Sequence, residues 1–161
     1  MTLSFPSYWT LYFHNPVDQD WTLQSYKKIS TFKNVEDYWK IMNQLQGDII
    51  ENGMFFLMKE DLPPLWEAKE HINGGSLCFK IYRKYVSSTW TNLATYMLCN
   101  ELMSDTTLSH HLTGLTISPK KSFSIIKLWN DDSSMNLSEY IRTDIQHVSI
   151  KDTIYKAHNT R

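Results

Sequence analysis

The sequence predicts an α+β fold in which three helices pack on the convex face of a curved, antiparallel β-sheet. Two observations predict this class. Short segments in which apolar and polar residues alternate follow one another with turn residues between them, as neighbouring antiparallel strands do. Between these segments lie three stretches with helical signals. The helices would cover one face of the sheet, so the other face is expected to meet solvent or a ligand.

The 161 residues fit a single domain spanning residues 1–161, because they contain no repeat, linker or low-complexity tract. The formal net charge of −1 offers no basic excess for duplex DNA, so any nucleic-acid contact should be local. We find no signal-peptide pattern and no apolar run long enough to cross a membrane. Cys78 and Cys99 form no CxxC pair. We therefore expect a cytoplasmic protein, monomeric by itself, with no metal or cofactor.

The first strand is predicted at residues 8–13, an aromatic and β-branched segment. The two-residue period places Trp9, Leu11 and Phe13 on one face of this strand. A polar loop follows, and the chain returns as a second strand at residues 26–32.

The first helix is predicted from about residue 35 to residue 46. Asn34 is a suitable N-cap, and Glu36 and Asp37 place negative charge in the first turn, where the helix dipole favours it. Gly47 is a suitable residue to end the helix.

The remaining elements follow from the same signals. In chain order they are strands at 54–59 and 76–83, a helix capped by Ser87 or Ser88 that runs to about 103, strands at 113–118 and 122–129 joined by a hairpin at 119–121, a shorter helix at 137–143, and a final strand at 147–157.

No catalytic motif is present, since the sequence lacks GxSxG, Walker A, GxGxxG and HExxH patterns. The paired acids Asp131 and Asp132 follow a strand in a polar stretch and are interpreted as solvated turn residues. We therefore expect a binding protein and not an enzyme.

The six tryptophans divide by context. Trp9 lies in a strand pattern and Trp90 at the start of an apolar helix, so both are predicted to be core residues. Trp21 and Trp66 instead end polar or proline-stiffened loops, and loops commonly carry function. These two are the candidate ligand platforms.

Glu67 directly follows Trp66, and the pair suits the recognition of guanine. A carboxylate accepts both N–H groups of the Watson–Crick edge of guanine. Methylation at N7 makes the base cationic, and a cation over an indole face gains on the order of 2 kcal/mol when desolvated. Taken alone, Glu67 is better interpreted as a solvated surface acid, and only its place beside Trp66 favours the binding role.

Three lysines are candidate phosphate contacts. Lys127 shares a strand face with Trp129, whereas Lys120 and Lys121 lie at the hairpin tip. Lysines at such a tip commonly serve only solubility, but near a bound nucleotide they would contact phosphate.

The helix at 35–46 also offers a surface candidate. Its apolar face, which suits the sheet, consists of Tyr38, Ile41, Met42 and Leu45. Val35 and Trp39 lie well round from that centre, so the residues alone leave Trp39 open as either half-buried core or an exposed anchor for a partner.

Several segments resemble the mRNA cap-binding translation initiation factor 4E family over nearly the whole chain. They are Trp9-Thr10-Leu11-Tyr12-Phe13, Ile29-Ser30-Thr31-Phe32, Val35-Glu36-Asp37-Tyr38-Trp39, Trp66-Glu67 with Gly74-Gly75 behind it, and the spacing from Gly114 to Trp129. The resemblance implies a sheet cupped around the cap with three helices on its back.

The resemblance also implies roles for individual residues. Trp21 and Trp66 would sandwich the methylated guanine, and Glu67 would hold its edge together with the backbone N–H of Trp66. Trp129 would touch the N7-methyl group. Val35 and Trp39 would form part of a dorsal patch that takes the helical motif of the scaffold factor 4G or of repressors.

The chain departs from the family at the phosphate-binding positions. Ser76 stands where the family usually has an arginine, and Lys120-Lys121 replace an arginine of the hairpin. Ile125 replaces the next phosphate lysine, with Lys127 two residues on. We therefore expect rearranged phosphate binding in a minimal, divergent member whose ends are shorter than the family's.

The expected function is to bind the 7-methylguanosine cap of mRNA and to recruit a scaffold protein like factor 4G for translation initiation. One alternative is a repressor or cap reservoir that binds caps without recruiting scaffold. Another is a protein-interaction module whose cap slot is degenerate. A sugar-binding aromatic platform is disfavoured, because sugars do not need the pairing of a cation–π site with Glu67.

Overall fold

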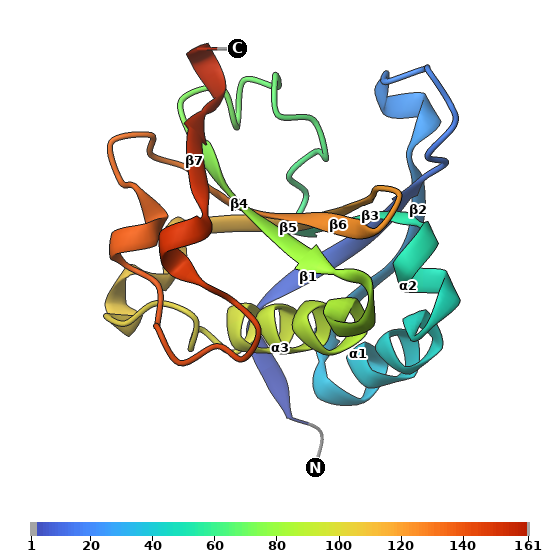
Figure 1. Ribbon diagram of the computed structural model, residues 1–161, viewed down its shortest axis with the longest axis horizontal. Helices are drawn as coiled ribbons and strands as arrows, with labels where there is room; N and C mark the ends of the chain where they lie inside the picture. Colours follow the sequence, from blue (N-terminus) through green and yellow to red (C-terminus); the bar gives the residue numbers. More distant parts are fainter. Residues whose placement is uncertain (1–2, 161) are drawn as a thin grey trace.

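The computed structural model describes residues 3–160, which form one seven-stranded sheet with helices against one face (Figure 1). The strands are β1 (Ser4–His14), β2 (Lys27–Asn34), β3 (Met54–Lys59), β4 (Gly75–Tyr82), β5 (Leu112–Pro119), β6 (Phe123–Asn130) and β7 (Ile154–Ala157). Their spatial order is β2-β1-β3-β5-β6-β4-β7, and every neighbouring pair is antiparallel. The predicted α+β class is confirmed.

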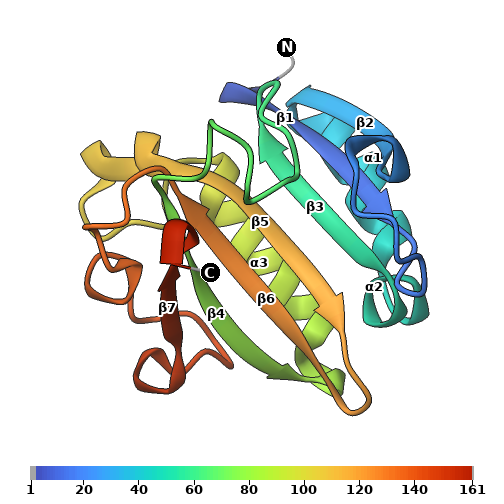
Figure 2. The same cartoon turned by 90° about the horizontal axis from the view of Figure 1, so that it is seen from above.

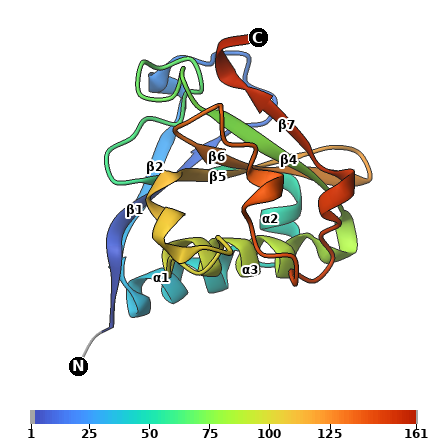
Figure 3. The same cartoon turned by 90° about the vertical axis from the view of Figure 1, so that its left-hand side faces the viewer.

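Three α-helices occur among the described residues: α1 (Val35–Met42), α2 (Asp48–Asn52) and α3 (Val86–Leu98). All three lie on the same side of the sheet (Figure 3). The core fills the space between this face and the helices. Trp9 and Trp90 are both buried in it, as predicted, and so is Leu11.

The start of α1 follows the predicted capping. The side chain of Asn34 accepts a hydrogen bond of 2.8 Å from the backbone N–H of Asp37, which satisfies one of the free donors of the first turn. Tyr38 and Met42 then face the core and are fully buried. The 3.6-residue period of the sequence therefore identified the correct face of this helix.

The end of this helix differs from the prediction. α1 ends at Met42 and continues only as a 3-10 turn, Asn43–Leu45. Gly47 adopts a positive φ of 64° and precedes α2, which the sequence did not predict. The positive φ redirects the chain, and a helix of five residues is too short to show a periodic pattern.

The second helix was predicted with wrong ends. α3 begins at Val86 after Tyr85, so neither Ser87 nor Ser88 is its cap, and the Ser88 hydroxyl donates to the carbonyl of Tyr85 instead. It ends at Leu98, and Asn100 at a φ of 57° turns the chain away.

The C-terminal region contains less regular structure than predicted. The helix expected at 137–143 is only a 3-10 turn, Leu137–Glu139, and Ile141 forms an isolated bridge with Met103. The strand expected at 147–157 shrinks to β7. The cause is a φ of 67° at His147 and a 3-10 turn at Ile150–Asp152, because neither conformation belongs to a strand.

The hairpin between β5 and β6 is confirmed, with the backbone N–H of Lys120 donating to the carbonyl of Phe123 at 2.8 Å. Among the described residues no helix is long and apolar enough to cross a membrane.

Candidate functional site

A cavity of about 480 Å³ opens on the face of the sheet opposite the helices, a size typical of small-ligand sites. Its lining residues are Trp21, Tyr26, Met54, Phe56, Pro64, Trp66, Glu67, Thr116, Ser118, Lys127 and Trp129. The β1–β2 and β3–β4 loops rise above this face, while α1 and α3 lie below the other (Figure 1). The structure thus brings together the predicted Trp21, Trp66, Glu67, Trp129 and Lys127.

The floor of the cavity is a second apolar cluster, separate from the core beneath the sheet. Phe56, Met58 and Trp129 form its buried centre, and Trp66 and Tyr26 pack against it. β3 is therefore buried on both faces, with Phe55 and Leu57 in the main core. Gly114 on β5 permits the close packing, because a Cβ there would lie 2.7 Å from the Sδ and Cε of Met58.

Trp21 is held by the local geometry of its loop. The Asp18 carboxylate accepts from the backbone N–H of Asp20, and the Asp20 carboxylate accepts from that of Thr22, both at 2.9 Å. Such turns suit Asp residues and stiffen the loop. Trp21 remains 46% exposed beside the cavity.

One face of the Trp21 indole is covered by a residue that the sequence analysis missed. The His14 ring stacks on it, with centroids 4.0 Å apart and planes within 5°. His14 is fully buried, and its Nε2 donates to the carbonyl of Asp20 at 2.7 Å. This bond crosses from the end of β1 to the loop, so His14 fixes both the backbone and the ring beside it.

Trp66 and Glu67 lie in the β3–β4 loop. Buried His71, in the same loop, donates from Nε2 to the carbonyl of Pro63 at 2.8 Å, which braces the loop internally, and burial lowers the pKa of the His71 imidazole. Trp66 is partly buried against the cavity floor, whereas Glu67 is exposed at the cavity rim.

The negative charge of Glu67 acts on Tyr26, another residue that lines the cavity. Burial and, to a smaller extent, the negative charge of Glu67 together raise the pKa of Tyr26 to about 12. The cavity thus combines aromatic walls with one carboxylate, and Lys127 adds a positive charge from β6. Such a set suits a flat ligand that is cationic at one end and anionic at the other.

Trp129 lines the cavity although it is only 3% exposed. Two histidine rings contact it in T-shaped arrangements, His71 at a centroid distance of 5.1 Å and His158 at 5.2 Å. His158 donates from Nδ1 to the carbonyl of His71 at 2.8 Å and accepts from the Ser76 hydroxyl at 2.6 Å. Ser76 is therefore a buried structural residue, and this position supplies no positive charge to the cavity.

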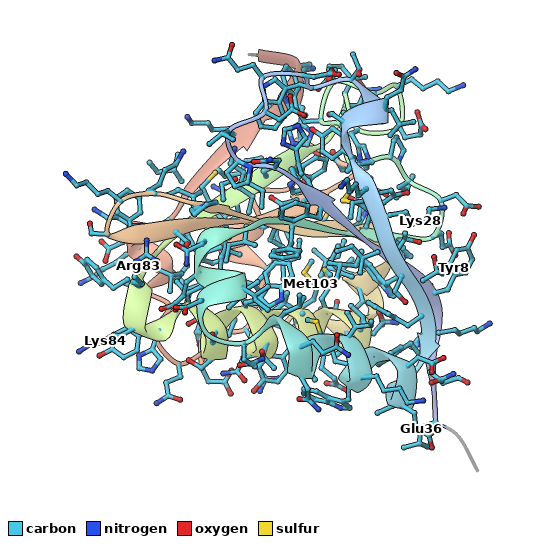
Figure 4. All side chains as sticks on the ribbon, turned by 90° about the vertical axis from the view of Figure 1, so that its right-hand side faces the viewer. Tyr8, Lys28, Glu36, Arg83, Lys84 and Met103 are labelled. Carbon is cyan, nitrogen blue, oxygen red and sulfur yellow. The ribbon has the colours of Figure 1, made fainter. Side chains whose placement is uncertain are left out.

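The remaining lysine candidates are separated from the cavity. Lys120 and Lys121 lie exposed at the tip of the β5–β6 hairpin and do not line it. Their carbonyl oxygens each accept from Nη2 of Arg83 at 3.2 Å, which anchors the tip to the end of β4. Figure 4 shows Arg83 and Lys84 at this end of the sheet.

Val35 and Trp39 lie on α1, on the side of the sheet away from the cavity (Figure 3). Trp39 is 36% exposed and leans edge-on against Tyr38 at a centroid distance of 5.1 Å. Val35 is half-buried against the core. The side chain of Trp39 is therefore neither fully core nor fully free, and it presents part of an apolar ring to solvent.

Three comparisons with known proteins bear on this geometry. The family model described as "Eukaryotic initiation factor 4E" matches residues 4–161. The chain belongs to the eukaryotic initiation factor 4E family. The members found are translation initiation factors and not enzymes.

Individual relatives of the initiation factor 4E family are distant. Translation initiation factor 4E-2 of Schizosaccharomyces pombe is 27% identical over 164 residues, covering 93% of this chain and 65% of that protein. An isoform 4E of Capsicum annuum is 29% identical over 126 residues, covering 75% of this chain and 61% of that protein. The chain thus spans about half to two thirds of the length of the curated relatives it matches.

The fold comparison agrees. A structure of Caenorhabditis elegans eIF4E-3, in complex with the 4E-binding protein Mextli and a cap analogue, superposes with a TM-score of 0.79. It is 19% identical to this chain, and the match covers 99% of this chain and 95% of that one. The cupped sheet with its helices is therefore the fold of the family.

Besides His14 behind Trp21, sequence reasoning missed several residues that line the cavity. They are Tyr26, Met54, Phe56, Pro64, Thr116 and Ser118. The two-residue period would have found four of them, since Thr116 and Ser118 share one face of β5, and Met54 and Phe56 share the face of β3 that alternates with its core residues. Tyr26 and Pro64 carried no such signal, because loop packing decides their place.

Proposed function

We propose that this chain binds the 7-methylguanosine cap of mRNA in the cavity, with the base between Trp21 and Trp66. Glu67 accepts hydrogen bonds from the guanine edge, Trp129 lies beside the N7-methyl group, and Lys127 contacts phosphate. The observation that carries the proposal is the convergence of two loop tryptophans, one carboxylate and one lysine on a single cavity. The cap analogue in the C. elegans complex supports the same class of ligand.

The second part of the proposal concerns the dorsal surface, formed by Val35 and Trp39 on α1. The exposed part of Trp39 and the half-buried Val35 beside it offer an apolar surface on α1 that suits an amphipathic partner helix. A binding protein accompanies the C. elegans relative, so a peptide partner is in keeping with the family. We propose that this surface takes a scaffold protein like factor 4G and that the pair acts in translation initiation in the cytoplasm. The alternative is a repressor or reservoir that binds caps without scaffold.

Methyl selectivity tests the cap site directly. A cationic base gains about 1–2 kcal/mol on each indole face, whereas a neutral base lacks this term. We expect a methylated cap analogue to bind at least tenfold tighter than its unmethylated twin, since tenfold is about 1.4 kcal/mol. Quenching of tryptophan fluorescence measures both affinities. Equal affinities would contradict the sandwich.

His14 supplies a second test, because it acts through Trp21. His14→Ala removes the ring that backs the indole, and a stacked pair is worth about 0.5–1.5 kcal/mol beyond its buried area. We expect a roughly three- to tenfold loss of cap affinity. His14→Phe keeps a stacking ring and should restore much of the binding. His110→Ala, at an exposed histidine outside the cavity, is the control. If His14→Ala binds the cap normally, Trp21 does not depend on the ring behind it.

A further inference from the structure

The cavity face of the sheet continues past the cavity along β4 and β6. In the antiparallel register, Ser76 lies opposite Trp129, Cys78 opposite Lys127, Lys80 opposite Ile125, and Tyr82 opposite Phe123. Directly opposed residues point to the same side of a sheet. Lys80, Tyr82, Phe123 and Ile125, here called the β4–β6 strip, therefore lie on the same face as Trp129 and Lys127. Figure 2 shows these two antiparallel strands side by side along their length.

Burial confirms which face the strip occupies. Phe79, Ile81 and Ile126 alternate with the strip residues and are buried in the core beneath the sheet. Tyr82 is 62% exposed, Lys80 is also exposed, and Phe123 and Ile125 are half-buried. The α-helices lie on the opposite face, so they do not cover the strip (Figure 1). Two aromatic rings beside one lysine are thus presented to solvent on a sheet surface.

Lys80 organises the two rings. Its Nζ lies 4.5 Å from the centroid of the Phe123 ring and 5.9 Å from that of Tyr82. Such a cation–π arrangement keeps the ammonium group on the surface beside both aromatic side chains. One positive charge and two aromatic rings are therefore held together on this surface.

The surroundings of the strip are positively charged although the whole chain has a net charge of −1. β4, β6 and β7 contain no aspartate or glutamate. The positively charged residues of these strands are Lys80, Lys127 and Lys156. Four more lie at the end of the strip near the hairpin, namely Arg83, Lys84, Lys120 and Lys121. This local excess complements a phosphate backbone, and exposed aromatic rings stack on bases of any sequence.

The strip is continuous with the proposed cap site. Lys127 lines the cavity, and Phe123 lies four residues before it on the same face of β6, about 13 Å at the usual rise per residue. A chain whose phosphates pass Lys127 therefore reaches the rings of the strip directly.

We propose that the β4–β6 strip binds the single-stranded RNA that follows the cap, with bases against Tyr82 and Phe123. Lys80 and the cations of the hairpin tip contact its phosphates. This inference rests on the proposed cap binding, because the cap sets the end of the RNA at Lys127. It also gives a role to Lys120 and Lys121, which lie outside the cavity.

The test compares three ligands: a methylated cap analogue, a short unstructured RNA that carries the cap, and the same RNA without it. We expect the capped RNA to bind the wild-type chain more tightly than the analogue does. Tyr82→Ala should lower the affinity for capped RNA about tenfold, the usual scale for loss of one stacked base, and leave the analogue within twofold. Tyr82→Phe keeps the ring and should bind as the wild type does.

Charge is tested separately. Lys80→Ala should lower the slope of log affinity against log salt concentration for capped RNA by about 0.7. Lys28→Ala removes another exposed lysine, from β2 at the far edge of the sheet, and should leave this slope unchanged. Thermal midpoints close to that of the wild type would show that the variants are folded.

Two outcomes would overturn the proposed binding of RNA to the strip. One is a capped RNA that binds no tighter than the analogue, and the other is a Tyr82→Ala variant that binds capped RNA normally. Either result would instead favour a protein partner as the ligand of the exposed rings. Failure of the cap site itself is a different result, in which the analogue does not bind but the uncapped RNA binds in a manner that depends on Tyr82.

Discussion

Glu67→Ala is expected to lose about 2–4 kcal/mol of cap binding, roughly 30- to 1000-fold in affinity. The carboxylate lies at the rim of the cavity, beside the loop tryptophan that would hold the base. Its removal takes away a charge-assisted pair of hydrogen bonds and leaves two guanine N–H groups without an acceptor. A titration with a methylated cap analogue, with tryptophan fluorescence as the readout, measures the loss of affinity.

Two further variants make this result specific. Glu70→Ala removes the same charge from the same loop, but Glu70 does not line the cavity, so it should bind the cap almost as the wild type does. Glu67→Gln keeps one acceptor and presents an amide N–H where an acceptor is needed, so it should also bind poorly. If Glu67→Ala binds normally, another group recognises the guanine edge.

Trp39→Ala is expected to abolish the binding of a scaffold-type helical peptide, a loss of at least 2 kcal/mol or about 30-fold. Val35 and Trp39 are four residues apart on α1 and so adjoin on its surface. Cap affinity should be nearly unchanged, because the sheet separates α1 from the cavity. Peptide binding and cap binding are measured on the same preparation.

The stability of the variant distinguishes an anchor from a core residue. Trp39 is already 36% exposed, so its truncation should lower the thermal midpoint only modestly. Trp90→Ala is the matched comparison, since Trp90 is 1% exposed and such a core truncation typically costs about 3–5 kcal/mol. If the thermal midpoint of Trp39→Ala falls as far as that of Trp90→Ala and cap binding is lost as well, Trp39 is a core residue and not a partner anchor. A wild-type chain that binds caps but no scaffold peptide would instead favour the repressor or reservoir.

Signals that act over a few residues made much of the fold predictable. The alternation of Trp9, Leu11 and Phe13 identified β1, and Asn34 identified the start of α1. The hairpin tip at 119–121 was equally clear. Each of these depends on backbone or burial preferences that neighbouring residues set, so the printed sequence was sufficient.

Elements without a period of their own were not predictable. α2 has five residues, and the segment at 137–153 contains two short 3-10 turns and one residue with positive φ, His147. Such conformations are chosen by the contacts of the folded chain and not by local propensity. The predicted helix at 137–143 and most of the final strand were wrong for this reason.

For the candidate site, sequence context alone singled out Trp21 and Trp66 as loop residues and placed Lys127 beside Trp129. Only the tertiary structure decided what surrounds them. His14 backs Trp21, and Ser76 is bonded to His158 across 82 positions of sequence. The hairpin carries Lys120 and Lys121 away from the cavity, whereas β6 points Lys127 into it. The physical reason is that the sequence specifies the chemical type of each residue, whereas strand pairing and loop packing over the whole sheet set the distances between residues that are far apart in the chain.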